Sequence, residues 1–135
     1  MRRFSKIAAV ALVASMTLAG CGKDDDSSGS SAAEGCEAGG DGSKVGIAYD
    51  VGGRGDRSFN DSAWAGMEKA ITDLDASCTE AKAAAGENDT QREERLRTLA
   101  DQGFNPVVAV GFIYSPAAAK VAAEFPDTNF AVIDG

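Results

Sequence analysis

The sequence contains no histidine, and its three cysteines lie far apart, at positions 21, 36 and 78. Zinc and related metal sites are built mostly from histidines and closely spaced cysteine pairs, so the sequence predicts no metal centre. It also lacks a nucleophile elbow and a phosphate-binding P-loop. These absences remove the commonest signs of an enzyme, and no cofactor is expected.

Basic residues are also scarce. Thirteen lysines and arginines stand against 21 aspartates and glutamates, which gives a net charge of -8. Three of the cations lie in the first 20 residues, so removal of that segment would change the net charge to -11. A strongly acidic chain repels phosphate backbones and anionic lipid head groups. Nucleic acid is therefore excluded as a partner.

The first 20 residues have the pattern of an export signal. Arg2, Arg3 and Lys6 precede a short apolar run at residues 7–18, and small residues follow before Cys21. A membrane-spanning helix needs about 20 apolar residues, so this run is too short. The segment Leu18-Ala19-Gly20-Cys21 resembles the lipobox of bacterial lipoproteins, which implies a diacylglycerol thioether on Cys21. The alternative is an ordinary secretory signal with a chance cysteine at its end.

Residues 21–43 are expected to form a flexible tether. Glycine, serine and aspartate dominate the stretch from Gly22, and it has no aromatic or branched apolar residue with which to build a core. Cys36 lies in this tether and Cys78 in the domain that follows. In an exported protein these two cysteines could form a disulfide, and two free thiols are the alternative.

From Lys44 onward, strand and helix patterns alternate. The second strand is rich in alanine and has the weakest pattern, whereas Trp64, Met67, Ile71 and Leu74 mark the buried face of the first helix. Strands that are apolar throughout, alternating with helices, indicate an α/β fold with a parallel, doubly wound sheet covered on both faces. The expected strands are residues 44–49, 79–85, 106–111 and 129–133, and the expected helices are 58–76, 90–102 and 115–125.

Each helix has a candidate start signal. Ser58 with Asp61, and Thr90 with Glu93, have the spacing of a capping box. Ser115 precedes Pro116, which predicts an N-cap with proline at the first helical position. In the second helix Leu96, Leu99 and Ala100 are expected to be buried, Gly103 is the stop signal, and Pro126 ends the third helix.

In a parallel sheet the loops after the strands lie at one edge, where ligands bind. We call the polar positions expected there the rim: Asp50, residues 86–89, Gly111 and Asp134. Glycines at 52, 53 and 55 would let the loop after the first strand turn tightly. The acids of that loop oppose a phosphate, whereas Phe59 offers a stacking face. An uncharged, hydroxyl-rich ligand with an aromatic part fits better.

The segments VGIAYDVGGRGDRSFNDSAWAGMEKA and GFIYSPAAAKVAAEFPDTNFAVIDG resemble the basic membrane protein family of substrate-binding lipoproteins of ABC transporters, which includes purine-nucleoside receptors. The resemblance covers the chain from Lys44. It implies a two-lobed fold like that of type I periplasmic binding proteins. Family members are more than twice as long, so residues 44–135 are expected to be part of the N-terminal lobe.

The resemblance also implies roles for five residues. Asp50 and Asn60 would hydrogen-bond the ligand, Phe59 would stack on a base, Gly111 would line the site and Asp134 would bind ribose hydroxyls. Four of them have a structural alternative: Asp50 and Asp134 as turn formers, Phe59 as a core residue and Asn60 as a first-turn helix residue.

The expected function is that of a lipid-anchored binding component of an ABC importer on the extracytoplasmic face of a bacterial membrane. Its partners would be a nucleoside-like solute, an ABC permease and, through the anchor, the membrane. A surface sensor or a lipoprotein of the same fold with no transport role is the main alternative. An enzyme that uses Asp50 or Asp134 as an acid or base is a third reading.

Overall fold

The structure is a computed structural model that describes Cys36 and residues 40–135. The predicted signal, Cys21 and most of the predicted tether lie outside the described residues.

Four strands form one parallel sheet in the order β2-β1-β3-β4. Each of the neighbouring pairs β1–β2, β1–β3 and β3–β4 is parallel, as the sequence predicted. The strand order reverses between β1 and β3, because β2 lies on one side of β1 while β3 and β4 lie on the other. The strands are β1 (Lys44–Ala48), β2 (Ser77–Ala81), β3 (Val107–Val110) and β4 (Phe130–Ile133).

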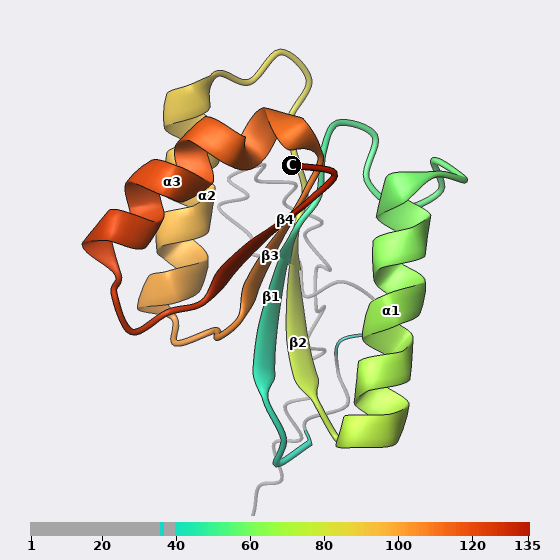
Figure 1. The fold of residues 1–135 in the computed structure, drawn as a ribbon. Coiled ribbons are helices and arrows are strands. Elements are labelled where there is room, and N and C mark those ends of the chain that lie inside the picture. Colours follow the sequence, from blue (N-terminus) through green and yellow to red (C-terminus); the bar gives the residue numbers. More distant parts are fainter. Residues whose placement is uncertain (1–35, 37–39) are drawn as a thin grey trace, which may run out of the picture.

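The helices cover both faces of this sheet. Helix α1 (Phe59–Leu74) lies on one face, and α2 (Asp89–Asp101) and α3 (Ser115–Glu124) lie side by side on the other (Figure 1). A short 3-10 helix, η1 (Phe112–Tyr114), leads from β3 into α3. The predicted alternation of strands and helices is therefore confirmed.

Two apolar clusters hold the helices to the sheet. Burial of each large apolar side chain contributes about 1.5–3 kcal/mol, so both clusters are needed for the fold. Trp64, predicted as core, is buried, as are Leu96, Leu99 and Ala100. The cluster under α2 and α3 contains Leu96, Leu99, Val107, Tyr114 and Val121, and the cluster under α1 contains Ile47, Tyr49, Trp64, Met67 and Val110.

The predicted buried face of α1 is wrong at one residue. Leu74 is 71% exposed, because the helix ends there and Asp75 turns the chain away with a φ of 54°. Leu74 borders an apolar hollow of about 390 Å³ between α1 and the strands β1 and β3, whose lining includes Val45, Met67 and Val108. Helix α1 thus leaves part of its face of the sheet open.

The predicted capping box at the start of α1 is also wrong. Ser58 is the N-cap residue, but its side chain makes no capping hydrogen bond. The carboxylate of Asp56 accepts hydrogen bonds from the backbone amides of Ser58, Asn60 and Asp61 instead. Asp61 reaches back further and accepts hydrogen bonds from the amides of Gly55 and Arg57.

The start signals predicted for the other two helices are displaced. The N-cap of α2 is Asn88, two residues before Thr90, and Asn88 forms the capping box with Gln91. Glu93, the other half of the predicted box, pairs with Lys120 of α3. Ser115 is already helical, because η1 precedes it and Tyr114 occupies the N-cap position.

The second strand lies earlier than predicted, at Ser77–Ala81 and not at 79–85. Residues 40–43, which the sequence analysis assigned to the tether, are bound to the domain: Gly42 N donates to Asp75 O at 2.9 Å. A disulfide joins Cys36 to Cys78 of β2, which is the pairing considered from the sequence. The packed part of the chain therefore extends before Lys44.

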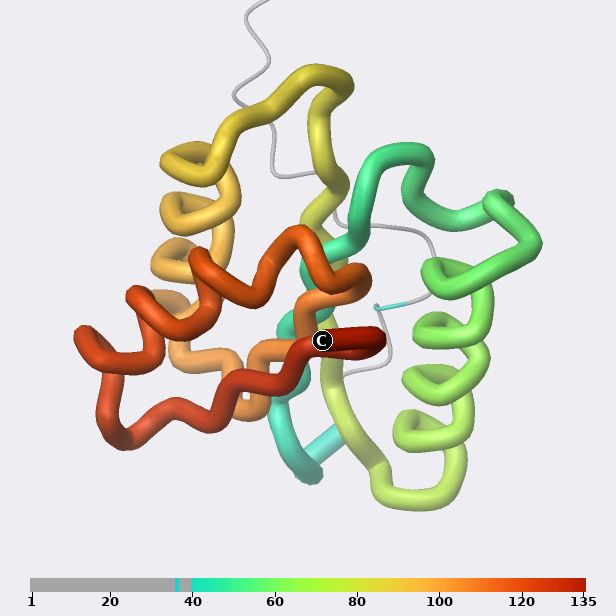
Figure 2. Tube along the Cα trace, turned by 45° about the horizontal axis from the view of Figure 1, so that its top comes forward, coloured from blue at the N-terminus to red at the C-terminus, as the bar shows by residue number. Residues whose placement is uncertain are grey.

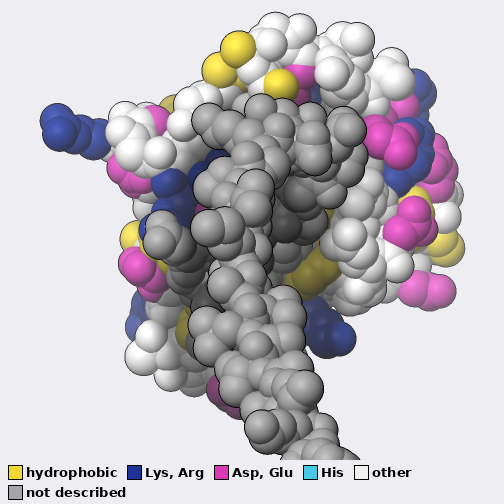
Figure 3. Space-filling model, turned by 180° about the vertical axis from the view of Figure 1, so that it is seen from behind, with side chains coloured by type: hydrophobic (Ala, Val, Ile, Leu, Met, Phe, Trp, Pro, Cys, Tyr) yellow, Lys and Arg dark blue, Asp and Glu magenta, His cyan; other side chains and the backbone are white. Residues whose placement is uncertain are grey.

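Charged side chains of both signs lie together over the outer surface of α2 (Figure 3). Arg97 bonds Glu124 of α3 and Glu93, which cross-links the two helices. Such pairs explain how an acidic domain avoids a block of like charge. Among the described helices, none is both long and apolar enough to cross a membrane.

Candidate functional site

The carboxyl ends of all four strands lie at the same edge of the sheet. In Figure 1 this edge is at the top, and in Figure 2 it is tilted toward the viewer, with the last residue between the two helical layers. The loop before α1, the loop before α2 and the 3-10 helix η1 surround it. The sequence therefore placed the rim correctly as one continuous edge.

Three rim residues lie on adjacent strands. The register pairs Ala48 with Ala109, and Val110 with Ile133, so Asp50, Gly111 and Asp134 follow neighbouring strand ends. Gly111 N donates to Ile133 O at 3.0 Å, which ties the last two together. Asp50 and Gly111 lie at the point where the strand order reverses, the usual place for a ligand crevice in an open α/β sheet.

Asp50 is held by its own backbone neighbourhood. Its amide donates to Oδ1 of Asn60 at 3.2 Å, and its Oδ1 accepts a hydrogen bond from Val51 N at 2.6 Å. Its carbonyl accepts a hydrogen bond from Gly53 N at 3.1 Å. The carboxylate is thus fixed relative to the start of the glycine-rich loop.

The acids of the loop between β1 and α1 shape the loop. Gly52, Gly53 and Gly55 have positive φ, and so does Arg57, at 54°. Partial desolvation raises the pKa of Asp56, but hydrogen bonds from the amides of Ser58, Asn60 and Asp61 outweigh it and lower that pKa below its usual value. The carboxylates of Asp56 and Asp61 thereby occupy amides that a phosphate would otherwise use.

Phe59 and Asn60 begin the same helix but face different surroundings. Phe59 is 52% exposed, which leaves its ring available for stacking and argues against a core role. Asn60 is 2% exposed, and its side-chain oxygen is occupied by the Asp50 amide. The structure therefore gives Asn60 a bond that orients Asp50.

Asp134 follows the end of β4 with a φ of 62° and an exposed side chain. Aspartate tolerates this left-handed conformation better than most residues. The conformation agrees with a turn-forming role, and the exposure leaves the carboxylate free to meet a solute.

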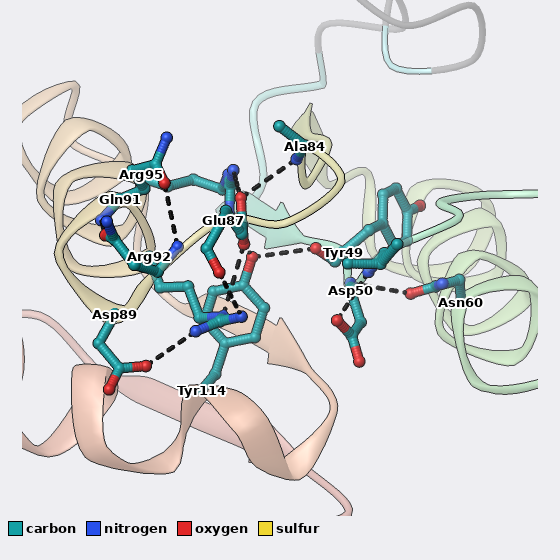
Figure 4. Close-up of polar contacts among 12 residues, drawn as sticks. Tyr49, Asp50, Asn60, Ala84, Glu87, Asp89, Gln91, Arg92, Arg95 and Tyr114 are labelled. Carbon is teal, nitrogen blue, oxygen red and sulfur yellow. Dashed lines mark hydrogen bonds and ion pairs between the residues drawn. The ribbon is translucent and has the colours of Figure 1, made fainter.

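A chain of polar residues that the sequence did not predict runs inward from Glu87, which lies within the predicted rim segment 86–89. Glu87 forms a two-pronged ion pair with Arg95, whose Nη1 lies 2.8 Å from Glu87 Oε1. Arg95 Nη1 also donates to the hydroxyl of Tyr114 at 2.6 Å, and that hydroxyl donates to Tyr49 O at 2.9 Å (Figure 4). Tyr49 directly precedes Asp50, so the chain ends at the rim.

Ionic bonds of this kind change the acidity of both partners. Burial alone would raise the pKa of Glu87, but hydrogen bonds from Arg95 and Ala84 lower it below its usual value. The Glu87 carboxylate raises the pKa of Arg95, and burial raises the pKa of Tyr114. The pair is therefore ionised at neutral pH, and the tyrosine is a neutral hydroxyl.

A signal for this chain was present in the sequence. Arg92 and Arg95 recur at helical spacing with Leu96 and Leu99, and a cation at such spacing faces the core beside a partner. Glu87 also ion-pairs with Arg92, across 3.5 Å. The spacing could have indicated a buried arginine, but it does not show which carboxylate forms the ion pair with it.

A second hollow lies beside the rim. It measures about 420 Å³ and is lined by Arg54, Trp64 and Lys82 among others. Neither this hollow nor the apolar one includes Asp50, Phe59, Asn60, Gly111 or Asp134. Within the described residues no group of three or more histidine, cysteine or acidic side chains could hold a metal ion.

The domain is an open α/β sheet covered on both faces, with polar residues gathered where the strand order reverses, which is where such domains usually bind ligands. The family model of PnrA-like ABC transporter substrate-binding proteins matches residues 43–135. The chain belongs to this family, which confirms the resemblance stated from the sequence.

Individual relatives agree with this assignment. An uncharacterized lipoprotein of Pyrococcus abyssi is 38% identical over 92 residues, which cover 67% of this chain and 22% of the relative. An ABC transporter nucleoside-binding protein of Lactococcus lactis is 27% identical over 139 residues, covering 98% of this chain and 36% of the relative.

A solved structure has the same fold. It is the solute-binding protein of an ABC transporter system from Aeropyrum pernix, with a TM-score of 0.62 and 32% identity. The match covers 69% of this chain and 25% of that protein. The chain therefore spans well under half the length of the relatives that it matches.

Proposed function

We propose that this chain forms one wall of the ligand cleft in a lipid-anchored, extracytoplasmic solute-binding component of an ABC importer, and that the solute is a purine nucleoside. Asp134 accepts hydrogen bonds from the ribose hydroxyls, and Asp50 accepts them from a ring or amino N–H group. Phe59 stacks on the base, and Gly111 allows the solute to approach the sheet edge. Asn60 holds Asp50 in place through the hydrogen bond that it accepts from the Asp50 amide.

One observation carries the proposal. Asp50, Gly111 and Asp134 follow three adjacent strand ends, and an exposed aromatic ring begins the helix beside them. Carboxylates accept hydrogen bonds and donate none when ionised, so this edge favours a donor-rich, uncharged solute. The loop amides are occupied by Asp56 and Asp61, which disfavours a nucleotide phosphate.

The family and its members supply the biological setting. A Lactococcus lactis relative is named as a nucleoside-binding protein of an ABC transporter, and Pyrococcus relatives are named as lipoproteins. Together with the export signal and the lipobox, these names support anchoring through Cys21. An ABC permease is then the partner that receives the solute. Binding requires no covalent chemistry.

The proposal is tested by calorimetric titration of the complete gene product with adenosine, guanosine and inosine. We expect at least one to bind and adenosine monophosphate to bind far more weakly. Asp134→Gly removes the carboxylate while accepting the φ of 62°, so it should weaken binding about 10- to 100-fold without backbone strain.

Asp127→Gly is the matched control, because Asp127 is exposed in the loop between α3 and β4, at the other edge of the sheet. The nucleoside affinity of Asp127→Gly should equal that of the unchanged protein. Failure of all three nucleosides to bind would overturn the nucleoside assignment. An unchanged affinity in Asp134→Gly would remove Asp134 from the site.

A further inference from the structure

The peptide group between Tyr49 and Asp50 is held at both of its polar atoms. Its carbonyl accepts a hydrogen bond from Tyr114 Oη, and its N–H donates to Asn60 Oδ1. Tyr114 and Asn60 are both buried and come from opposite faces of the sheet, η1 on one side and α1 on the other. The peptide cannot rotate without breaking one of these bonds.

We propose that Tyr114, Arg95 and Glu87 are positioning residues that set the direction of the Asp50 carboxylate for the solute. Glu87 lies within the predicted rim segment 86–89, but none of the three has a role in the solute contacts proposed above. The inference rests on the proposed function, because it says how the recognition residue of that site is aimed.

The order of donors and acceptors gives the chain a direction. A guanidinium group only donates, so the Tyr114 oxygen accepts from Arg95 and its single proton is left for Tyr49 O. The charge on Arg95 polarises the hydroxyl and strengthens that bond. A phenylalanine at 114 would have nearly the same shape and would remove the hydrogen bond to Tyr49 O, while Arg95 would keep its ion pair with Glu87.

Glu87 keeps the guanidinium in place. Its side chain is only 1% exposed, and it accepts hydrogen bonds from Arg95 and from Ala84 N at 3.1 Å. A buried charge with so many partners has one favoured geometry, because any movement leaves an unsatisfied group. Figure 4 shows the chain running from this carboxylate through Tyr114 to the Tyr49 carbonyl.

The orientation of the peptide passes directly to the carboxylate. Asp50 Oδ1 accepts a hydrogen bond from Val51 N, and Asp50 O accepts one from Gly53 N, so side chain and loop turn together. A free peptide would have to be ordered when solute binds, and that cost reduces affinity. A peptide that is already fixed in the folded protein has lost this conformational freedom during folding, so solute binding does not incur the cost.

The test compares Tyr114→Phe with the unchanged complete gene product. We expect nucleoside affinity to fall about tenfold, which corresponds to the loss of one buried hydrogen bond. We also expect faster hydrogen exchange at the Asp50 amide, measured by NMR without ligand, and unchanged exchange in β4. The exchange readout does not depend on the solute, so it tests the positioning role even if no nucleoside binds.

A matched pair on α2 controls for charge and helix stability. Arg95→Lys loses the fork that reaches both Glu87 and Tyr114, so it should reproduce both effects. Arg97→Lys, two residues along, loses a fork to Glu124 on the outer surface and should change neither.

The proposal is overturned if Tyr114→Phe leaves affinity and Asp50 exchange unchanged. It is also overturned if exchange rises equally in β4 or if Arg97→Lys has the same effect, since the role would then be structural only. If Tyr114→Phe no longer unfolds cooperatively, Glu87→Gln is the second test, because it keeps the Tyr114 hydroxyl and the Arg95 guanidinium. This variant must still speed hydrogen exchange at the Asp50 amide and lower nucleoside affinity.

Discussion

Gly111 lies against the carboxylate of Asp50, so a side chain at position 111 would force that carboxylate to move. A Cβ placed on Gly111 would lie 2.9 Å from Asp50 Oδ2, which is closer than real Cβ contacts allow. Its φ of 100° would also strain the backbone of any residue other than glycine. The end of β3 is therefore fitted to the end of β1 at the reversal of strand order.

Gly111→Ala should destabilise the protein and weaken its solute binding. The methyl group must displace the Asp50 carboxylate, and alanine is strained at a φ of 100°. Strain of this kind costs about 1–3 kcal/mol of unfolding free energy. Urea denaturation would measure the stability, and calorimetry with the nucleoside panel would measure binding.

Gly66→Ala is the control for this substitution. Gly66 lies inside α1 with open space around its Cβ position, so alanine there should stabilise by about 0.5–1 kcal/mol and leave binding unchanged. Equal stability of the two variants would contradict the close fit between Gly111 and Asp50.

The fold was predictable because each strand is a nearly continuous apolar run. Val107, Ala109 and Val110 are all buried, as expected for a strand covered on both faces. The exception was β2, whose sequence Ser-Cys-Thr-Glu-Ala has no such run. Its position depends on pairing with β1, which no local pattern reports.

Helix starts were much less predictable, because several residues near each start have capping spacing. Asn88 with Gln91 and Thr90 with Glu93 both satisfy the same rule, two residues apart. The structure uses the first pair, and Glu93 instead accepts a hydrogen bond from Lys120 at 2.7 Å. Local spacing does not distinguish these two choices, and the contact of Glu93 with a distant helix is not visible in it.

Asp56→Ala should cost more stability than Ser58→Ala. Asp56 accepts hydrogen bonds from three backbone amides at the start of α1, whereas the Ser58 side chain makes no capping bond. Loss of an N-terminal cap costs about 0.5–2 kcal/mol. Urea denaturation of both variants would measure the difference. A larger loss in Ser58→Ala would show that the serine caps the helix after all.

The rim, including Glu87 within residues 86–89, was predictable, and the network that joins Glu87 to Arg95 and Tyr114 was not. Asp50, Gly111 and Asp134 follow strands, so topology alone brings them together. Glu87, Arg95 and Tyr114 lie in a loop, a helix and a 3-10 helix, and only the packing of α2 against the sheet joins them. The spacing of residues in the sequence does not predict how α2 packs against the sheet.

Stability should fall in acid, partly through Glu87. The folded-state pKa of Glu87 lies below its usual value of 4.5, so its contribution is complete above pH 4.5 and disappears as pH falls through the lower folded value. The free energy of unfolding should therefore decrease steadily below pH 4.5. Urea denaturation from pH 7 down to pH 2 would measure this dependence.

Glu87→Gln should be less stable than the unchanged protein at pH 7, with a smaller further loss below pH 4.5. Glu94→Gln is the control, since Glu94 is exposed and approaches Arg97 only to 3.9 Å. Its curve should match that of the unchanged protein. If the free energy of unfolding of Glu87→Gln fell as steeply below pH 4.5 as that of the unchanged protein, Glu87 would not be a source of the acid sensitivity.

Arg54 and Glu80 should show energetic coupling that exposed ion pairs lack. Arg54 Nη1 lies 3.0 Å from Glu80 Oε1, the Glu80 side chain is fully buried, and the Arg54 guanidinium lies 3.9 Å from the centroid of the Trp64 ring. Arg54→Met keeps an unbranched apolar stem but leaves a buried carboxylate without this cation. We expect a loss of about 1–3 kcal/mol, with part of it recovered in Arg54→Met/Glu80→Gln.

A double-mutant cycle in urea separates the coupling from the single effects. The exposed pair Lys69 and Asp73, one turn apart on α1, is the matched cycle, and its coupling should stay within about 0.5 kcal/mol. If the stability losses of the Arg54 and Glu80 substitutions were additive to within the same limit of about 0.5 kcal/mol, the buried carboxylate would not be stabilised by the arginine. The position of the loop that carries Asp56 and leads to Phe59 would then depend on other contacts, such as the hydrogen bond from the Asp50 amide to Asn60.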